Sequence, residues 1–270
     1  MSLSDGSALG RSASTESLSL IDHIFIIRTL LLRDLRLKYL SHPAGIFLEF
    51  LRPTLVCGLH YFVFWATGRV FAASIPLEQF IWGGFMIWFI FSTVTAMLHS
   101  GRVSMKLPFP GVSAMHVRIA VCIWPVIIFT CFTYISVALM KIFGDNIDFP
   151  NIPLSAVLIL LTAAIGFGWG LLIEGLGRMV PLIEPVTHFI PWLLFLSSGI
   201  YFSTANLPPQ ILIVDLYNPM LHLLEFERYA FDPGYPVFLV NLTYPAICAA
   251  VLLLLGLALN RHIRRVPLHT

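Results

Sequence analysis

Charge is scarce in this sequence: only 11% of its 270 residues are Asp, Glu, Lys or Arg, while 58% are hydrophobic. A soluble globular chain carries about 25% charged residues and about 45–50% apolar ones. So few charges cannot cover the surface of a soluble domain, and the apolar area left exposed would aggregate. The composition argues against a soluble enzyme, a nucleic-acid-binding protein and a disordered chain. It favours a protein that crosses a membrane several times.

The sequence also lacks the motifs of common catalytic and nucleotide-binding sites. It contains no G-x-x-x-x-G-K-[ST] phosphate loop, no G-x-G-x-x-G and no H-E-x-x-H. The nine histidines have no metal-ligand spacing, and the four cysteines are not closely paired. We therefore expect a chain that is not an enzyme and that binds neither a metal nor a cofactor of its own.

Long apolar blocks are present instead, each close to the roughly 20 residues that a spanning helix needs. The fifth of them is the weakest, because Pro185 and Pro191 interrupt it. No carboxylate lies near the middle of a block, as a proton-driven transporter would require. The blocks predict an all-α membrane protein with six transmembrane helices, at about 50–68, 80–98, 119–140, 154–173, 184–202 and 237–259.

The segment before the first block is a different kind of helix. Within residues 20–40, apolar residues recur at helical spacing while Arg33 and Arg36 project to the other side. With Asp34 and Lys38 they put four charges into six residues, which is too costly for the middle of a bilayer. We expect an amphipathic helix in the membrane interface, its basic side chains reaching toward headgroups.

The basic residues predict the orientation of the chain. With the N-terminus in the cytoplasm, only Arg69, Lys141 and Arg228 of the sixteen Lys and Arg residues fall outside. The positive-inside rule therefore places both termini in the cytoplasm. Residues 1–19, rich in Ser, Gly and Ala, are expected to form a flexible cytoplasmic tail, and residues 263–270 a second one.

Two of the connections between blocks are longer than a turn. The inner loop 99–118 is basic. The outer segment 203–236, called the outer hairpin below, contains apolar patches at 207–216 and 220–231, neither long enough to cross a bilayer. We expect two short re-entrant helices before the last span; an ordinary folded loop is the alternative.

Small and aromatic residues within the blocks leave further alternatives open. Gly166, Gly168 and Gly170 allow close helix packing, either at a homodimer face or inside one chain. The aromatic residues either line a conduit as platforms for sugar rings or anchor helix ends at the membrane interface. The candidate conduit residues are Tyr61, Trp65, Trp82 and Trp88.

This organisation resembles the permease subunit of ABC-2 type polysaccharide exporters, and within that family the capsular polysaccharide branch. The first motif is the run LRDLRLKY (32–39) followed by GIFLEFLRP (45–53). Leu40 stands where the family usually has a small residue, and Arg52 where it usually has an acid before the proline. Glu49, one turn earlier, is a candidate substitute for that acid.

Two further motifs carry the resemblance, which covers roughly residues 25–265. SGIYF (198–202) running into NLPPQ (206–210) is similar to the end of span five entering the outer hairpin. YNPMLHLLE (217–225) is similar to the asparagine-proline helix that returns toward span six.

The resemblance implies an ABC-2 type transmembrane domain over residues 20–262 of a multi-pass protein in a bacterial inner membrane. It implies a homodimer of this chain with two copies of a separate ATPase subunit, which would bind ATP and Mg²⁺. The substrate would be a lipid-linked polysaccharide. Periplasmic and outer-membrane export components are further candidate partners, and nucleic acid is not.

The resemblance also implies three groups of site residues besides the conduit aromatics. The substrate would enter along the interface helix and the first span, at Arg28, Arg33, Arg36, Lys38, Tyr39, Glu49 and Arg52. The ATPase would engage a coupling loop containing Arg102, Lys106, Pro108, Pro110, His116 and Arg118. The outer hairpin would act through Leu207, Pro208, Asn218, Pro219, Glu225 and Arg228.

The predicted function is thus export of capsular or related lipid-linked polysaccharide, driven by ATP hydrolysis on the partner subunit. Within transport, the same architecture would suit O-antigen, a teichoic acid or a small hydrophobic compound. A non-transporting membrane scaffold for glycan synthesis is the alternative from another class. An intramembrane enzyme comes third, because paired acids and an activated nucleophile are missing from the sequence.

Overall fold

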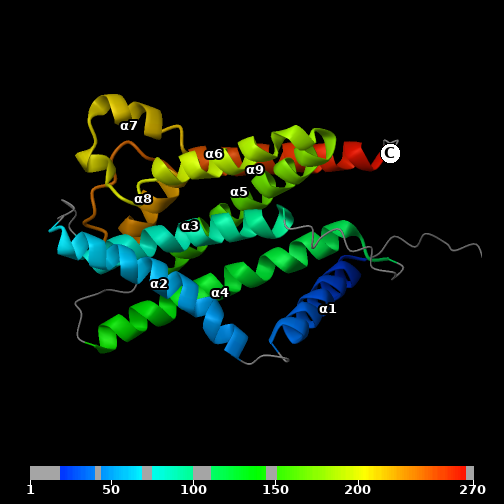
Figure 1. Ribbon diagram of the computed structural model, residues 1–270, viewed down its shortest axis with the longest axis horizontal. Coiled ribbons are helices and arrows are strands. Elements are labelled where there is room, and N and C mark those ends of the chain that lie inside the picture. The colour runs from blue at the N-terminus through cyan, green and yellow to red at the C-terminus, as the bar shows by residue number, and fades with distance from the viewer. Residues whose placement is uncertain (1–18, 40–43, 69–74, 100–110, 144–150, 266–270) are drawn as a thin grey trace, which may run out of the picture.

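The computed structural model describes residues 19–39, 44–68, 75–99, 111–143 and 151–265. These residues form helices and no strand, which confirms the predicted all-α class for the described part of the chain (Figure 1). The helices are α1 (Leu20–Tyr39), α2 (Ala44–Ala66), α3 (Leu77–His99), α4 (Ala114–Ile142), α5 (Ile152–Met179), α6 (Glu184–Leu196), α7 (Pro209–Asp215), α8 (Pro219–Phe231) and α9 (Thr243–Arg265).

Among the described residues, five helices are long and apolar enough to cross a membrane: α2, α3, α4, α5 and α9. The block predicted at 184–202 forms the 13-residue α6, which ends at Leu196. At 1.5 Å per residue α6 is about 20 Å long, shorter than the hydrocarbon core of about 30 Å. The chain continues beyond it through a turn at Gly199, whose φ is +81°. The count of spans is thus five by helix length, one fewer than predicted.

The core of the molecule lies along α3, which packs against α2, α4, α5 and α8. Its large side chains Phe85, Met86, Ile90 and Phe91 are buried. A helix that is apolar on all sides is stable only when neighbours or lipid surround it, and α3 is the most enclosed of the five candidate spans. It therefore forms the centre around which the other helices are arranged.

Glycines bring α5 against its two neighbours within the same chain. A Cβ at Gly168 would lie 2.7 Å from the backbone of α9 at Leu252, and one at Gly166 would lie 3.0 Å from the carbonyl oxygen of Phe91 on α3. Gly170 faces the Leu98 side chain of α3 at 2.7 Å. These contacts favour internal packing over a homodimer face for the three glycines predicted to pack closely.

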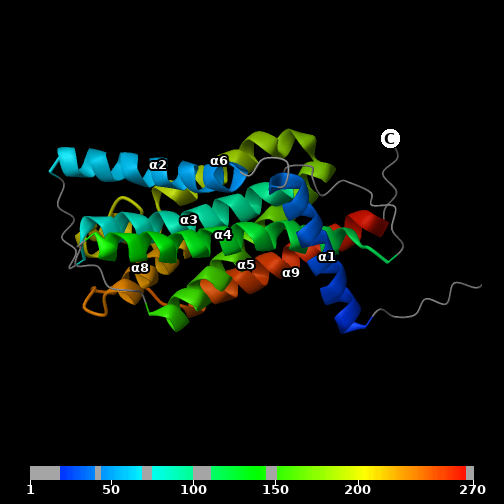
Figure 2. The same ribbon diagram turned by 90° about the horizontal axis from the view of Figure 1, so that it is seen from below.

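The ends of the helices fall into two groups. Figures 1 and 2 show α1, the start of α4, the end of α5 and the end of α9 at one end of the molecule, with α7 and α8 at the other. Helix α1 crosses the bundle obliquely and packs on α4, where Leu30 contacts the cluster of Val117 and Ala120. This crossing leaves room between α1 and the bundle, where a pocket lies.

Candidate functional site

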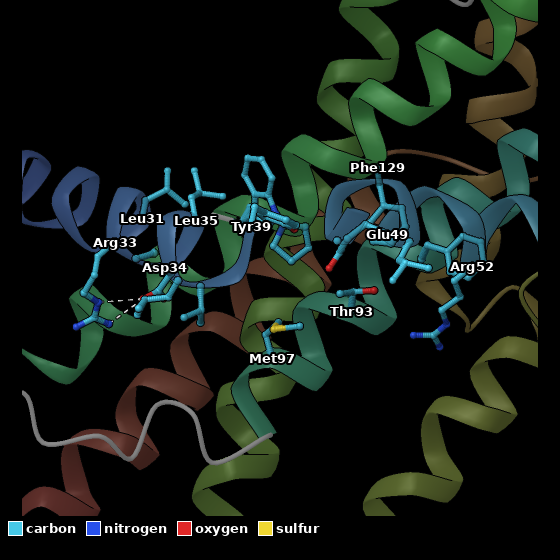
Figure 3. A pocket seen from close by; sticks show the side chains of 18 of the residues that line it. Leu31, Arg33, Asp34, Leu35, Tyr39, Glu49, Arg52, Thr93, Met97 and Phe129 are labelled. Carbon is cyan, nitrogen blue, oxygen red and sulfur yellow. Dashed lines mark hydrogen bonds and ion pairs between the residues drawn. The ribbon is translucent and has the colours of Figure 1, made fainter. Parts of the chain in front are cut away.

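A pocket with a volume of about 1200 Å³ is lined by residues of α1, α2, α3 and α4 (Figure 3). Ligand pockets of small-molecule sites usually measure about 300–1,000 Å³. This one is therefore large enough for a long amphipathic molecule. Its walls combine apolar side chains from all four helices with a few charged ones from α1 and α2.

The charged residues of the pocket come from the two segments that flank residues 40–43. On α1, the guanidinium of Arg33 donates to the carboxylate of Asp34, with Nη2 and Oδ1 2.8 Å apart. On α2, Glu49 and Arg52 line the pocket three residues apart, so that they share one side of the helix. Figure 3 shows Arg33 and Asp34 toward one end of the pocket and Arg52 toward the other, with Glu49 between them. An anionic group can thus meet a guanidinium at either end.

The end of α1 is fixed to α4 by an aromatic contact in the wall of this pocket. The indole Nε1 of Trp124 donates a hydrogen bond to the Tyr39 hydroxyl at 2.7 Å, and the ring centroids are 5.6 Å apart. Tyr39 is the last residue of α1 and is buried. The contact therefore determines how far the end of α1 stands from the bundle.

The part of the pocket wall that comes from α3 and α4 carries no charge. Phe89, Thr93 and Met97 line the pocket from α3, and Phe129 lines it from α4. The rings of Phe89 and Phe129 stack with centroids 5.5 Å apart. A mostly apolar wall opposite charged side chains suits a ligand with a lipid part and a polar, anionic part.

The structure brings together four of the seven residues predicted where substrate enters: Arg33, Tyr39, Glu49 and Arg52. Arg28 and Arg36 are exposed and are not part of the pocket wall. The backbone of Lys38 belongs to α1, and its side chain lies outside the described residues.

Sequence reasoning missed the pocket residues on α3 and α4. Thr93, Met97 and Trp124 lie within apolar blocks that were interpreted only as spans. The indole of Trp124 in the middle of a block, with an N–H to satisfy, was the one available signal.

The predicted coupling loop is only partly within the described residues. Arg102, Lys106, Pro108 and Pro110 lie outside them. At the start of α4, His116 is buried and its Nε2 is 2.7 Å from Nδ1 of His23 on α1. The Ser113 N–H donates to Nδ1 of His116, which caps the helix. His116 thus joins the first turn of α4 to α1.

Arg118 lies inside the bundle between α4 and α5. Its side chain is 1% exposed, and Nη2 donates to Oε1 of Glu174 at 2.8 Å. Arg178, one turn further along α5, donates to the same oxygen at 2.6 Å. Such a buried guanidinium offers no surface to a partner, so any effect of Arg118 on a partner passes through the helices that it joins.

Asn218 forms the joint between the outer hairpin and α6. Its Oδ1 accepts from the Met220 N–H at 2.9 Å and so caps α8, with Pro219 at the first helical position. Its Nδ2 donates to the Leu194 carbonyl oxygen and to the Ser197 hydroxyl, both at 2.8 Å. One buried amide therefore satisfies the ends of two helices.

Glu225 and Arg228 form an ion pair inside the outer hairpin, with Nη1 and Oε1 2.8 Å apart and both side chains 0% exposed. Arg228 also donates to the carbonyl oxygens of Gly199 at 2.6 Å and Phe202 at 3.1 Å, beyond the end of α6. Its guanidinium lies 3.5 Å from the centroid of the Phe80 ring on α3. Sequence reasoning selected both residues but gave no hint that they were buried.

The remaining hairpin residues are at the surface or half-buried: Leu207 is half-buried and Pro208 is exposed at the start of α7. Of the candidate conduit aromatics, Trp82 stacks on Phe132, and Trp88 packs against Phe91 and Phe195. Tyr61 is half-buried against the core, and Trp65 is 65% exposed near the end of α2. Only Trp65 presents most of its ring to the outside of a single chain.

No protein-family model matches this chain. The chain is similar to the polysialic acid transport protein KpsM of Escherichia coli, with 24% identity over 242 residues that cover 87% of this chain and 92% of that protein. It is also similar to the capsule polysaccharide export inner-membrane protein BexB of Haemophilus influenzae, with 28% identity over 102 residues, or 38% of each chain. The predicted resemblance to capsular polysaccharide export permeases is thereby confirmed.

Proposed function

We propose that this chain is the membrane permease subunit of an ATP-driven exporter that moves capsular or related lipid-linked polysaccharide across a bacterial inner membrane. The observation that carries the proposal is the pocket between α1 and the bundle, which combines charged side chains from α1 and α2 with mostly apolar ones from α3 and α4. The similarity to KpsM, a polysialic acid transport protein, extends over almost the whole of both chains. BexB adds a second relative whose name joins capsule export to the inner membrane.

The pocket is where the substrate would enter. The lipid part would lie against Phe89 and Met97, and an anionic linkage would be held by Arg33 or Arg52 at the rim. The contact between Tyr39 and Trp124 would set the width of this opening. Guanidinium groups suit this task, because they bind carboxylate or phosphate oxygens in a bidentate way.

The proposed topology has six crossings, with a re-entrant outer hairpin before the last. What supports it is the course of the chain: α5 ends, and α6 begins, at the end of the molecule where α9 terminates, whereas α7 and α8 lie at the opposite end (Figures 1 and 2). In this topology residues 181–202 would make the fifth crossing, with α6 as its helical part. The distribution of Lys and Arg supports placing both termini, and the tails 1–19 and 263–270, in the cytoplasm.

The energy would come from two copies of a separate ATPase subunit, each holding ATP and Mg²⁺. Those subunits would engage the ABC-2 type domain, residues 20–262, near the start of α4. His116 and Arg118 would transmit movement there, the first to α1 and the second to α5. Two copies of this chain would enclose the conduit between them, where Trp65, exposed in one chain, is the best placed of the aromatic platforms.

Deletion of the gene tests this function directly. The polysaccharide should be synthesised but retained inside the cell, and complementation should restore it to the surface. The identity of the retained polymer distinguishes capsule from O-antigen or teichoic acid. If the chain is instead a non-transporting scaffold, deletion should lower the synthesis of the polysaccharide itself. The purified complex with the ATPase should then hydrolyse ATP at a rate that does not respond to the substrate.

A further inference from the structure

A buried carboxyl group lies on α8, apart from the pocket, and the proposed transport path does not use it. The Glu227 side chain is 1% exposed. It lies where α8 packs against both α3 and α5. A carboxylate in such a place loses its hydration and needs strong partners to remain charged.

The partners of Glu227 are few. The hydroxyl of Ser155 on α5 donates to Oε1 at 2.8 Å. Oε2 is buried and has no hydrogen-bond partner. On the α3 side, a Cβ placed at Gly83 would lie 3.7 Å from Cγ of Glu227 and 3.2 Å from the Phe231 ring. The carboxyl thus sits in a narrow slot bounded by α3 and α5.

No basic side chain of the described residues forms an ion pair with Glu227. The nearest cation along α8, Arg228, is occupied by Glu225 and by the carbonyl oxygens beyond α6. His222, on the same helix, donates from Nε2 to the Leu216 carbonyl oxygen and accepts at Nδ1 from the Asn241 N–H, so it is a neutral ring.

The other elements around α8 also bring neutral groups. Helix α3 places Gly83 beside Glu227, and α5 contributes the Ser155 hydroxyl. Helix α9 contributes Tyr244, whose hydroxyl donates to the Tyr217 carbonyl oxygen. The Phe231 ring of α8 packs against Val137 and Met140 of α4. The next residue of α4, Lys141, is exposed. The negative charge of an ionised Glu227 would therefore be uncompensated.

The pKa of Glu227 agrees with this geometry. Burial raises it from 4.5 to about 7, while the hydrogen bond from Ser155 lowers it. Because the pKa is higher in the packed state than in water, packing favours the protonated acid. That contribution is fully present below about pH 4.5, is lost as the pH rises from there to about 7, and changes no further at higher pH.

Buried hydrogen bonds join α8 to the rest of the outer hairpin. Glu225 accepts from the hydroxyls of Thr204 at 2.6 Å and Tyr235 at 3.0 Å. Arg228 holds the carbonyl oxygens beyond α6. These buried contacts join both ends of the outer hairpin to α8, so a displacement of α8 displaces the hairpin.

We propose that Glu227 is a positioning residue of the outer hairpin: protonated, it seats α8 between α3 and α5, and deprotonated, it releases the hairpin toward the outer face. On release, the proton on Oε2 passes to water and the carboxylate becomes hydrated, while the Ser155 hydroxyl is freed from Oε1. For export, this release means that the exit opens more readily at alkaline pH; that consequence rests on the proposed function.

Hydrogen exchange of the full-length chain in lipid nanodiscs tests the proposal without any transported substrate. The protection of peptides covering 219–231 is measured from pH 4.5 to 8.5, relative to the exchange rate of the unstructured sequence at each pH. In the wild type, protection should fall by up to about tenfold per pH unit between about pH 4.5 and 7, as expected for one linked proton, and should level off above pH 7. Protection that stays constant over this range overturns the proposal.

Three variants separate this role from a merely structural one. Glu227→Gln, which cannot ionise, should keep its protection across the pH range, whereas the matched control Glu78→Gln on α3 should behave like the wild type. Ser155→Ala removes the hydrogen bond that favours the carboxylate, so the midpoint should move to higher pH. An unchanged midpoint in Ser155→Ala overturns the proposal even where Glu227→Gln does not fold. If the intact wild-type complex moves no polysaccharide but shows the expected exchange profile, the transport function is contradicted and this proposal stands.

Discussion

The Trp124 indole donates its hydrogen bond to the Tyr39 hydroxyl across 2.7 Å, and this contact connects the last residue of α1 to the middle of α4. Both side chains line the pocket, so one contact forms part of its wall and also fixes the helix that bounds it. This pair of residues therefore helps to hold the end of α1 beside the pocket, together with the contacts of Leu30 and His23 with α4.

Removing this hydrogen bond should loosen the attachment of α1 to α4 while the aromatic ring at position 39 still lines the pocket. Tyr39→Phe keeps the ring and leaves the half-buried Trp124 N–H without its acceptor, which costs about 0.5–1.5 kcal/mol. We expect faster hydrogen exchange in α1 and reduced export, with no change in α9. Phe62→Leu, at an exposed ring on α2, is the control for substituting an aromatic residue. Unchanged exchange in α1 would show that the contact does not hold the helix.

Reversing the charge at the pocket rim should impair export more than reversing it elsewhere on α1. Arg33→Glu and Arg52→Glu each place a negative charge where an anionic linkage would lie, and the double variant should export least. Arg36→Glu is the matched control, because Arg36 is exposed and is not part of the pocket wall. The measurement is surface polysaccharide at equal protein abundance in the membrane. Equal defects in Arg36→Glu and Arg33→Glu would indicate a general effect of α1 charge.

Asn218→Ala should destabilise the joint between α6 and the outer hairpin. It removes the cap of α8, worth about 1 kcal/mol, and leaves the Leu194 carbonyl oxygen without this donor. We expect a lower Tm of the purified chain and faster exchange in 219–224. Asn206→Ala, at an exposed amide in the same hairpin, should leave both unchanged. A wild-type Tm for Asn218→Ala would show that the hydrogen bonds of Asn218 do not stabilise the connection between α6 and α8.

A side chain at Gly168 should separate α5 from α9. In Gly168→Ala the new Cβ would lie 2.7 Å from the backbone at Leu252, so the helices must move apart. Overpacking of this kind costs about 1–3 kcal/mol. Gly177→Ala on the same helix meets nothing within 4 Å and should be neutral or stabilising. Thermal unfolding of both variants is the test, and equal Tm values would contradict the close packing.

The sequence was a good guide to elements whose cause is local. Apolar runs without charge predict spanning helices, and the dense charges at 33–38 predict a helix of another kind. Both depend on residues that are neighbours along the chain. The proline-containing block at 184–202 was harder, because the helix that it forms ends at Leu196 and is followed by a turn at Gly199.

The pairing of side chains from distant segments could not be predicted in the same way. Nothing near Trp124 in the sequence points to Tyr39, and nothing near Glu227 points to Ser155. Arg118 and Arg228 were selected as loop and hairpin cations, yet each is buried against a carboxylate. Such burial follows from helix packing, and periodicity does not encode it.

Reconstitution gives the most direct test of the central claim. The chain is purified with its partner ATPase, placed in lipid vesicles, and supplied with lipid-linked polysaccharide from the parent strain. ATP should drive the polysaccharide across the bilayer, and Arg33→Glu with Arg52→Glu should abolish this movement while the complex still forms. Equal ATP-dependent movement by the double variant would show that the pocket is not the route. No movement by the intact complex would contradict the export function itself.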